Sequence, residues 1–192
     1  GEQARGTRAD NDHVCFEYIF HAAAIKIWAL STIGVLQMPP VTQRIENEAE
    51  LAPFAARLGR LLRGGDVVCL RGDLGAGKSA LSRAVIRDLA GNPDEEVPSP
   101  TFTLVQMYDL PDFTLWHFDL YRLDEEERDI LELGWEEARR GGVALVEWPD
   151  RLGGLLPADR LEIDIRFVSG AEGARDIILT GHGAFQARLA GF

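Results

Sequence analysis

The sequence is poor in cysteine and in basic residues. Its 192 residues include two cysteines, Cys15 and Cys69, and 20 lysines and arginines against 31 aspartates and glutamates. Two cysteines far apart in the chain offer neither a disulfide framework nor a zinc site, and they are typical of a reducing compartment, so we expect a cytoplasmic protein. The formal net charge of −11 argues against a free-standing nucleic-acid binder, because phosphate contacts need a basic surface. We therefore expect no direct DNA binding.

Residues 1–37 differ in composition from the rest of the chain. A polar start leads into a mainly apolar run over residues 19–36, whose length approaches that of a membrane span. Lys26 lies inside this run, and a charged group near the middle of a span is costly, so we expect no membrane association. We predict an atypical extension over residues 1–37 that is not part of the native domain, and one domain over residues 38–192 with Met38 as its natural start.

The most specific pattern is G-x-x-x-x-G-K-[ST] at residues 72–79. The apolar run at residues 67–70 before it predicts a buried strand, and residues 80–89 carry apolar side chains at helical spacing. A strand, a glycine-rich turn and a helix together hold a polyphosphate through backbone N–H groups and the helix N-terminus. Lys78 is predicted to reach the outer phosphates and Ser79 to ligate Mg²⁺. The predicted nucleotide-binding residues of the loop are Asp73, Leu74, Gly75, Ala76, Gly77, Lys78 and Ser79.

Phosphate chemistry at such a loop needs an additional acid for the metal and a group that places the attacking water. Asp119 and Glu147 each follow an apolar strand, and an acid at the carboxyl end of a core strand faces the ligand side of an α/β sheet. We predict both as metal ligands and, with Lys78, as catalytic residues; the alternative for each acid is a solvated strand-end carboxylate. Thr101 and Thr103 follow an acidic loop and could sense a γ-phosphate, although threonine is also a good strand former.

Periodicity predicts the other elements of the domain. His117 offers no metal-ligand spacing and is interpreted as structural. The predicted elements are a helix over 48–62, an antiparallel hairpin of strands 101–108 and 113–121, a helical stretch over 124–140 interrupted at Gly134, a buried strand over 143–146, and a second hairpin of strands 161–167 and 176–180.

Together these motifs resemble the bacterial TsaE family, also called YjeE, the ATPase of tRNA threonylcarbamoyladenosine synthesis. The resemblance implies an α/β, three-layer, P-loop NTPase-like fold with a mixed parallel and antiparallel central sheet, and ATP and Mg²⁺ as ligands. By motif position it also implies that Trp148 shapes the nucleotide site. Ser79 departs from the threonine that most members carry, and Ala49 from the threonine of a Glu-Thr pair near the nucleotide. The motifs that carry the resemblance are residues 72–79, 99–104, 117–123, 132–134 and 146–149.

The resemblance further implies an ATPase that hydrolyses slowly alone, acts on the TsaB–TsaD heterodimer and meets tRNA only through that complex. Two alternatives remain open. A small-molecule or nucleoside kinase would use the same loop, but such enzymes usually add an arginine-bearing lid, whereas residues 123–127 are mostly acidic. A non-enzymatic nucleotide switch of the GTPase kind would carry a guanine-reading Asn-Lys-x-Asp motif, and the sequence has none.

Overall fold

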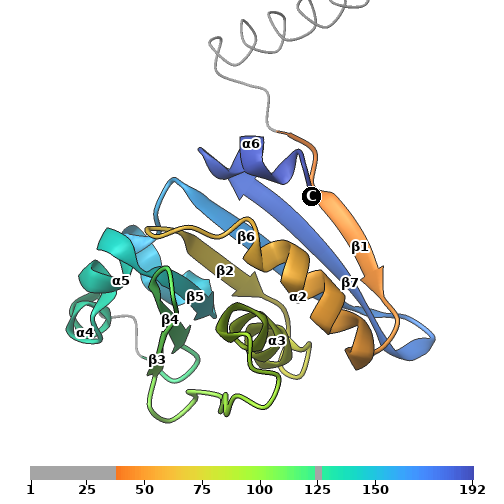
Figure 1. The fold of residues 1–192 in the computed structure, drawn as a ribbon, viewed down its shortest axis with the longest axis horizontal. Helices are drawn as coiled ribbons and strands as arrows, with labels where there is room; N and C mark the ends of the chain where they lie inside the picture. Colours follow the sequence, from red (N-terminus) through yellow and green to blue (C-terminus); the bar gives the residue numbers. More distant parts are fainter. Residues whose placement is uncertain (1–37, 124–126) are drawn as a thin grey trace, which may run out of the picture. The chain divides into compact units, whose positions relative to one another are not determined.

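The computed structural model of the chain describes residues 38–123 and 127–192 (Figure 1). The predicted extension over residues 1–37, with its apolar run, lies outside the described residues, as do residues 124–126 at the start of the predicted helical stretch. Met38–Phe192 forms one compact unit. Among the described residues, no helix has the length and apolar character needed to cross a membrane.

The centre of the domain is a seven-stranded sheet in the order β1-β7-β6-β2-β5-β4-β3. The inner pairs β6–β2, β2–β5 and β5–β4 are parallel, whereas β1–β7, β7–β6 and β4–β3 are antiparallel. The mixed sheet that the resemblance implies is therefore confirmed. The strands are β1 Val41–Ile45, β2 Val67–Arg71, β3 Val105–Asp109, β4 Thr114–Asp119, β5 Val143–Glu147, β6 Arg160–Val168 and β7 Ala171–His182.

Helices cover both faces of the sheet and give the three layers that were predicted (Figure 1). Alternate residues of β5 belong to two separate cores: Leu145 packs in the core that contains α2 and α3, and Val146 in the core that contains α4 and α5. The helices are η1 Glu48–Glu50, α2 Leu51–Gly59, α3 Lys78–Ala90, α4 Glu127–Glu132, α5 Trp135–Gly141, η2 Pro149–Leu155 and α6 Phe185–Leu189.

The predicted strand over residues 101–108 is wrong in its first half, because β3 begins at Val105. Leu104 has a φ of +65°, and its N–H donates to the carbonyl of Pro100 at 2.6 Å, so the chain turns instead of extending. The two threonines in this segment gave it the composition of a strand. A local hydrogen bond overrides that preference here.

Three further elements differ from the prediction. The helix over 48–62 is a 3₁₀ turn followed by α2, which ends at Gly59; Pro53 lies in its first turn, where a missing N–H breaks no helical bond. The edge strand β1 and the short helix α6 were not predicted. Both are five residues long, too short for a clear period.

Candidate nucleotide site

Strand β2 leads directly into the glycine-rich loop, which lies at the carboxyl edge of the parallel strands. Val67–Leu70 is buried on both faces of the sheet, so the start of the loop is fixed by packing. Gly72 has a φ of +140°, and a Cβ there would lie 2.5 Å from the carbonyl oxygen of Ile165, which leaves room for glycine alone. Gly77, with a φ of +112°, precedes α3 and makes no side-chain cap, so the first N–H groups of the helix are available to an anion.

Lys78 is buried at the base of this loop. Its Nζ donates to the carbonyl oxygens of Gly72 at 2.7 Å and of Asp73 at 2.9 Å, and it lies 4.0 Å from the ring centroid of Trp148. Burial lowers the pKa of Lys78, while the neighbouring carboxylates, Glu147 first among them, oppose that shift. The ammonium group is thus held inside the loop by polar contacts and by a ring face.

The two predicted acids lie side by side. Strands β4 and β5 are parallel and in register, so that Asp119 is opposite Glu147, and both carboxylates are buried. Ser79 Oγ donates to Glu147 Oε2 at 3.0 Å, which joins the loop to the end of β5. The structure therefore brings together the hydroxyl and the two carboxylates that were predicted as metal ligands.

A chain of hydroxyl groups leads from Ser79 to Asp119. Ser79 Oγ lies 3.5 Å from Ser99 Oγ, which lies 2.9 Å from Thr101 Oγ1, and Thr101 Oγ1 donates to Asp119 Oδ2 at 2.6 Å. The backbone N–H of Tyr121 donates to the other carboxylate oxygen of Asp119 at 3.1 Å. Thr101 is thus bonded to the site.

Thr103, the other candidate for a phosphate sensor, lies apart from these groups. Its hydroxyl accepts a hydrogen bond from Gln106 Nε2 at 3.3 Å, and its side chain is not among those that line the cavity at the loop. Of the two threonines, the structure places Thr101 alone in the site.

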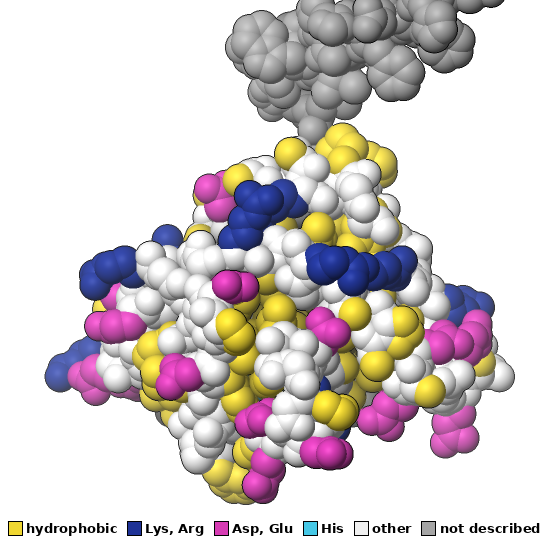
Figure 2. All heavy atoms as spheres, in the orientation of Figure 1, with side chains coloured by type: hydrophobic (Ala, Val, Ile, Leu, Met, Phe, Trp, Pro, Cys, Tyr) yellow, Lys and Arg dark blue, Asp and Glu magenta, His cyan; other side chains and the backbone are white. Residues whose placement is uncertain are grey.

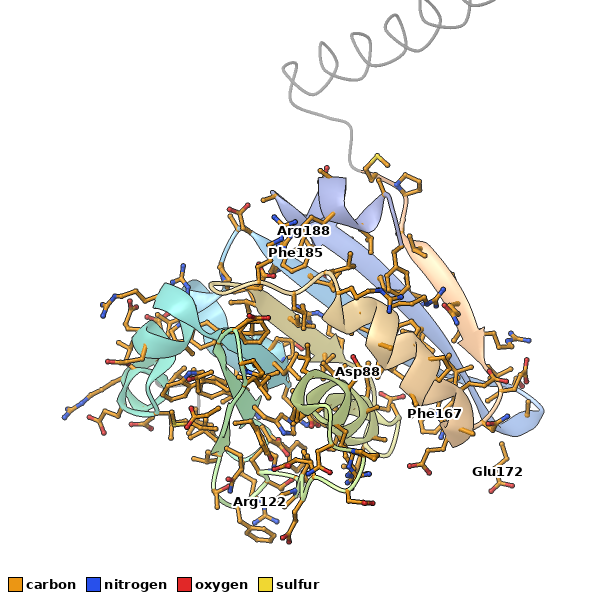
Figure 3. All side chains as sticks on the ribbon, viewed as in Figure 1. Asp88, Arg122, Phe167, Glu172, Phe185 and Arg188 are labelled. Carbon is orange, nitrogen blue, oxygen red and sulfur yellow. The ribbon has the colours of Figure 1, made fainter. Side chains whose placement is uncertain are left out.

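These groups surround a cavity of about 410 Å³. Asp73 and Ala76, although predicted, do not line it: Asp73 contributes its carbonyl to Lys78, and Ala76 is fully buried in the core. Arg122, which was not predicted as a site residue, does line it, and its guanidinium lies 4.2 Å from the ring centroid of Phe102 (Figure 3). The lining residues are Leu74, Gly75, Gly77, Lys78, Ser79, Ala80, Thr101, Asp119, Tyr121, Arg122, Glu147 and Trp148.

A second cavity, of about 310 Å³, adjoins the loop from its other side. It shares Gly77 and Ala80 with the first cavity, so the two flank the N-terminus of α3. Leu51 lines it from α2 and Arg175 from β7, and Arg175 Nε also donates to the carbonyl of Ala76 at 3.0 Å. The contact of Arg175 with the loop depends on a long-range pairing that no local sequence pattern reveals.

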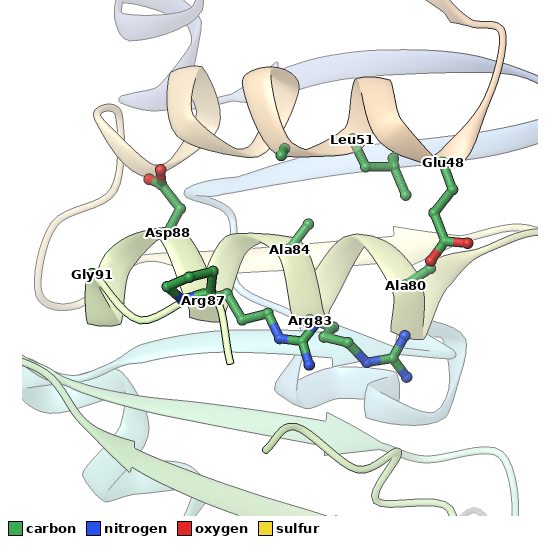
Figure 4. Close-up of a pocket in the computed structure, with 10 residues that line it drawn as sticks. Glu48, Leu51, Ala80, Arg83, Ala84, Arg87, Asp88 and Gly91 are labelled. Carbon is green, nitrogen blue, oxygen red and sulfur yellow. The ribbon is translucent and has the colours of Figure 1, made fainter. Parts of the chain in front are cut away.

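A third cavity, of about 430 Å³, lies between α2 and α3 (Figure 4). Its lining includes neither the loop lysine nor the two acids. Two arginines that line it are hydrogen-bonded to the segment before Ser99. Arg83 Nε donates to the carbonyl of Val97 at 3.3 Å, and Arg87 Nε donates to the carbonyl of Glu95 at 3.0 Å. We assign no ligand to this cavity.

The donor set at the loop fits Mg²⁺. Ser79, Asp119 and Glu147 offer oxygen atoms, which Mg²⁺ prefers, and the ion usually keeps several waters and phosphate oxygens as further ligands. In the described part of the chain, no three His, Cys, Asp or Glu side chains form a cluster that could hold a metal alone. A site with two carboxylates and one hydroxyl is therefore suited to a metal that arrives with a phosphate ligand.

Comparison with known proteins assigns the family. Residues 45–177 match the profile of the family described as threonylcarbamoyl adenosine biosynthesis protein TsaE. The chain is 40% identical to the TsaE protein of Rickettsia felis over 121 residues, which cover 63% of this chain and 70% of that protein. It is 35% identical to the TsaE protein of Bacillus subtilis over 147 residues, which cover 76% of this chain and 89% of the relative.

The fold is also similar to a solved structure. The crystal structure of Bacillus subtilis YdiB matches with a TM-score of 0.67 and 28% sequence identity, covering 82% of this chain and 95% of that one. The matched region of the family profile includes the phosphate loop, the acid at the end of β4 and the acid at the end of β5. The chain therefore belongs to the TsaE family of threonylcarbamoyl adenosine biosynthesis proteins.

Proposed function

We propose that the chain is a cytoplasmic Mg²⁺-dependent ATPase that serves the formation of threonylcarbamoyladenosine in tRNA. One observation carries the ATPase proposal: Ser79 of the phosphate loop is hydrogen-bonded to the buried carboxylate of Glu147 at the end of a neighbouring strand. In P-loop enzymes, a loop hydroxyl and an acid at the end of a neighbouring strand lie close together and hold the metal. The family name supports the tRNA context.

The residues around the loop have separate roles in binding. The N–H groups between Gly75 and Ser79 cradle the phosphates, and Lys78 turns from the loop carbonyls to the outer phosphates, where its charge is of most use. The second cavity, lined by Leu51 and Arg175, adjoins the loop at Gly77 and has room for the base and ribose. A nucleotide would thus extend around the N-terminus of α3.

The acids supply the chemistry. Ser79 Oγ and Glu147 Oε2 would hold the metal, and a Mg²⁺ ion there would supply positive charge that offsets the negative charge developing on the phosphate. Asp119, fixed by Thr101 and by the N–H of Tyr121, supports the metal or orients the attacking water. Trp148 closes the site beside Lys78 and packs against Tyr121, with ring centroids 4.9 Å apart.

The surface supports action through a partner. Leu74 and Tyr121 line the cavity and are 73% and 45% exposed, and Phe102, which packs against the lining residue Arg122, is 81% exposed. These three side chains form an exposed apolar rim beside the site. On the face drawn in Figure 2, acidic and basic side chains are interspersed, and the chain carries a net charge of −11, which is unfavourable for direct tRNA binding. We propose that the TsaB–TsaD heterodimer covers this rim, orders the loop over residues 94–103 and brings the tRNA.

Two other functions use the same cavity. Arg122 lines it, so the sequence argument against a kinase, which rested on the acidic segment 123–127, loses its force. A switch would bind ATP without turnover. Thin-layer analysis of radiolabelled ATP separates the three functions: phosphate release supports the ATPase, labelled acceptor a kinase, and unchanged ATP a switch.

The decisive variant is Glu147→Gln, which keeps the shape of the site and removes its charge. We expect retained nucleotide binding with hydrolysis lowered about a hundredfold or more, and a similar defect for Asp119→Asn. Normal hydrolysis by the Asp119 variant beside an inactive Glu147 variant would show that Asp119 is a strand-end carboxylate without a role.

The partner proposal is tested by reconstitution with limiting TsaB–TsaD heterodimer and excess tRNA. The heterodimer should accelerate hydrolysis by the wild type. If hydrolysis resets the complex, the wild type should support repeated rounds of modification and the Glu147→Gln variant about one round. Equal multiple-turnover yields from both proteins would contradict the resetting role and leave the binding role in place.

A further inference from the structure

His117 makes a hydrogen bond that its interpretation as a structural residue does not explain. The side chain is 0% exposed in the middle of β4, and its Nε2 lies 2.9 Å from Glu147 Oε1. In the parallel pair β4–β5, His117 is opposite Leu145, and Glu147 lies two residues further on the same face. The contact is thus a diagonal one between neighbouring strands, within reach of long side chains.

The partner determines which nitrogen carries the hydrogen. A carboxylate only accepts hydrogen bonds, so Nε2 of His117 must be the donor to Glu147. The other ring nitrogen, Nδ1, is buried and has no hydrogen-bond partner among the described residues.

The two carboxylate oxygens of Glu147 accept hydrogen bonds from different residues. Oε1 of Glu147 accepts from His117, while Oε2 accepts from Ser79 of the phosphate loop. A carboxylate rotates easily about its last torsion, so a single partner would leave its orientation loose. With one fixed donor behind it, Glu147 keeps Oε2 directed at Ser79.

The packing around the ring argues against a role in filling space. Leu115 and Leu145, its neighbours on β4 and across the strand pair, belong to the apolar core. An aliphatic side chain would fill such a position without the cost of burying a polar ring. Among the described residues, the polar contact of the His117 side chain is with Glu147.

We propose that His117 is a positioning residue that orients Glu147 for the metal. The inference rests on the proposed function, because it assigns Glu147 to Mg²⁺. Groups that orient a metal ligand from behind typically change metal affinity or activity about 10–100-fold when they are removed. His117 does not touch nucleotide or metal in this scheme, and its effect passes through Glu147.

The test measures metal binding separately from nucleotide binding. Calorimetry would give the affinity of the ADP complex for Mg²⁺, and the affinity for ADP in EDTA, for His117→Leu, His117→Gln and the core control Leu115→Val. We expect about tenfold weaker Mg²⁺ binding for His117→Leu with ADP affinity in EDTA within about twofold of wild type. His117→Gln should recover most of the loss, because its amide nitrogen lies as many bonds from Cβ as Nε2 does. The control should change neither affinity.

A double variant tests whether the effect of His117 on Mg²⁺ affinity depends on Glu147. In the Glu147→Gln background, His117→Leu should weaken Mg²⁺ binding by less than about twofold more, since residues that act as a unit are not additive. Unchanged Mg²⁺ affinity in a folded His117→Leu protein would overturn the proposal. Equal losses with and without metal, or full additivity with Glu147→Gln, would overturn it too.

Nitrogen-15 NMR of the histidine ring decides the case if His117→Leu does not fold. A hydrogen on Nε2, with ring signals that move in the Glu147→Ala protein, supports the proposal, whereas a hydrogen on Nδ1 alone contradicts it. Failure of the proposed function would give a different result from failure of this inference. The wild type would then bind ADP no better than the Lys78→Ala protein does, and the ring signals would still show whether His117 is hydrogen-bonded to Glu147.

Discussion

The loop lysine is bonded to its own loop. Lys78 Nζ donates to two carbonyl oxygens, those of Gly72 and Asp73, so a phosphate must compete with these bonds. A phosphate carries a full negative charge, so it attracts the ammonium group more strongly than a neutral carbonyl does. The bonds to the loop therefore hold Lys78 close to the position from which it would contact a phosphate. They lower the affinity for that phosphate only slightly.

Replacing Lys78 with alanine tests this assignment. We expect Lys78→Ala to weaken ATP binding by about 1.5–3 kcal/mol, the range of a charge-assisted contact, measured by calorimetry. Arg71→Ala is a matched control: it removes a positive charge just before the loop, but Arg71 pairs with Asp150 and does not line the cavity. Unchanged affinity of the Lys78 variant would rule out the phosphate role, and equal losses in both would indicate a general charge effect.

Cys69 reports on the integrity of the strand that carries the loop. Burial is the main cause that raises the pKa of its thiol to about 12, and the side chain is fully buried in β2. Because the thiolate is the reactive form, we expect no alkylation of Cys69 by iodoacetamide at pH 8 in the native protein, and full alkylation in urea. Peptide mass spectrometry resolves this site. Rapid modification without urea would show that β2 opens.

At the level of single residues, the sequence predicted the groups that follow apolar strands and missed those defined by side-chain contacts. Asp119 and Glu147 could be found because a strand that ends in an acid is a local pattern. The bond from His117 to Glu147 depends on the register of β4 against β5, which no local pattern specifies. Arg175 meets Ala76 from a strand about a hundred residues later.

Arg188 of the short helix α6 bonds this helix to the rest of the domain. Arg188 donates to both carboxylate oxygens of Asp66 at 2.7 Å and to the carbonyl of Leu61 at 2.9 Å, and its guanidinium lies 3.7 Å from the ring centroid of Phe185 (Figure 3). The pair is largely shielded from solvent. Two parallel bonds to a shielded carboxylate are stronger than a surface ion pair.

We expect Arg188→Ala to lower the free energy of unfolding by about 2 kcal/mol, because it leaves Asp66 and the carbonyl of Leu61 without this donor. Urea denaturation measures the change. Arg166→Ala is the control, since its side chain is 63% exposed and pairs with Asp164 on the surface; we expect less than about 0.5 kcal/mol there. Equal changes in the two variants would contradict the anchoring role of Arg188.

At the level of elements, prediction succeeded where burial requires a run of apolar residues and failed where strand pairing alone makes the structure. The buried strands β2 and β5 were predicted as continuous apolar runs. β1 has three polar residues in its five, and it is a strand because β7 pairs with it. Such an edge strand carries too little apolar pattern to be recognised alone.

The whole domain should not need its upstream segment. The family profile begins at residue 45 and the described unit at Met38, so we expect deletion of residues 1–37 to leave ATP affinity unchanged and the melting temperature within a few degrees of the full chain. Calorimetry and a thermal melt of both proteins measure this. A larger fall in melting temperature would show that the upstream segment stabilises the domain.

The pairing of β1 with β7 has a consequence for synthesis. β1 lies at the edge of the sheet, and its neighbour β7, Ala171–His182, is made after every other strand of the sheet. Arg175, which bonds to the carbonyl of Ala76 in the phosphate loop, belongs to the same late strand. A nascent chain therefore contains the sequence of the phosphate loop before it contains β7, the strand that pairs with β1 and carries Arg175. The finished fold, rich in long-range pairs, should form only after β7 has left the ribosome, and ATP has no completed site to bind before then.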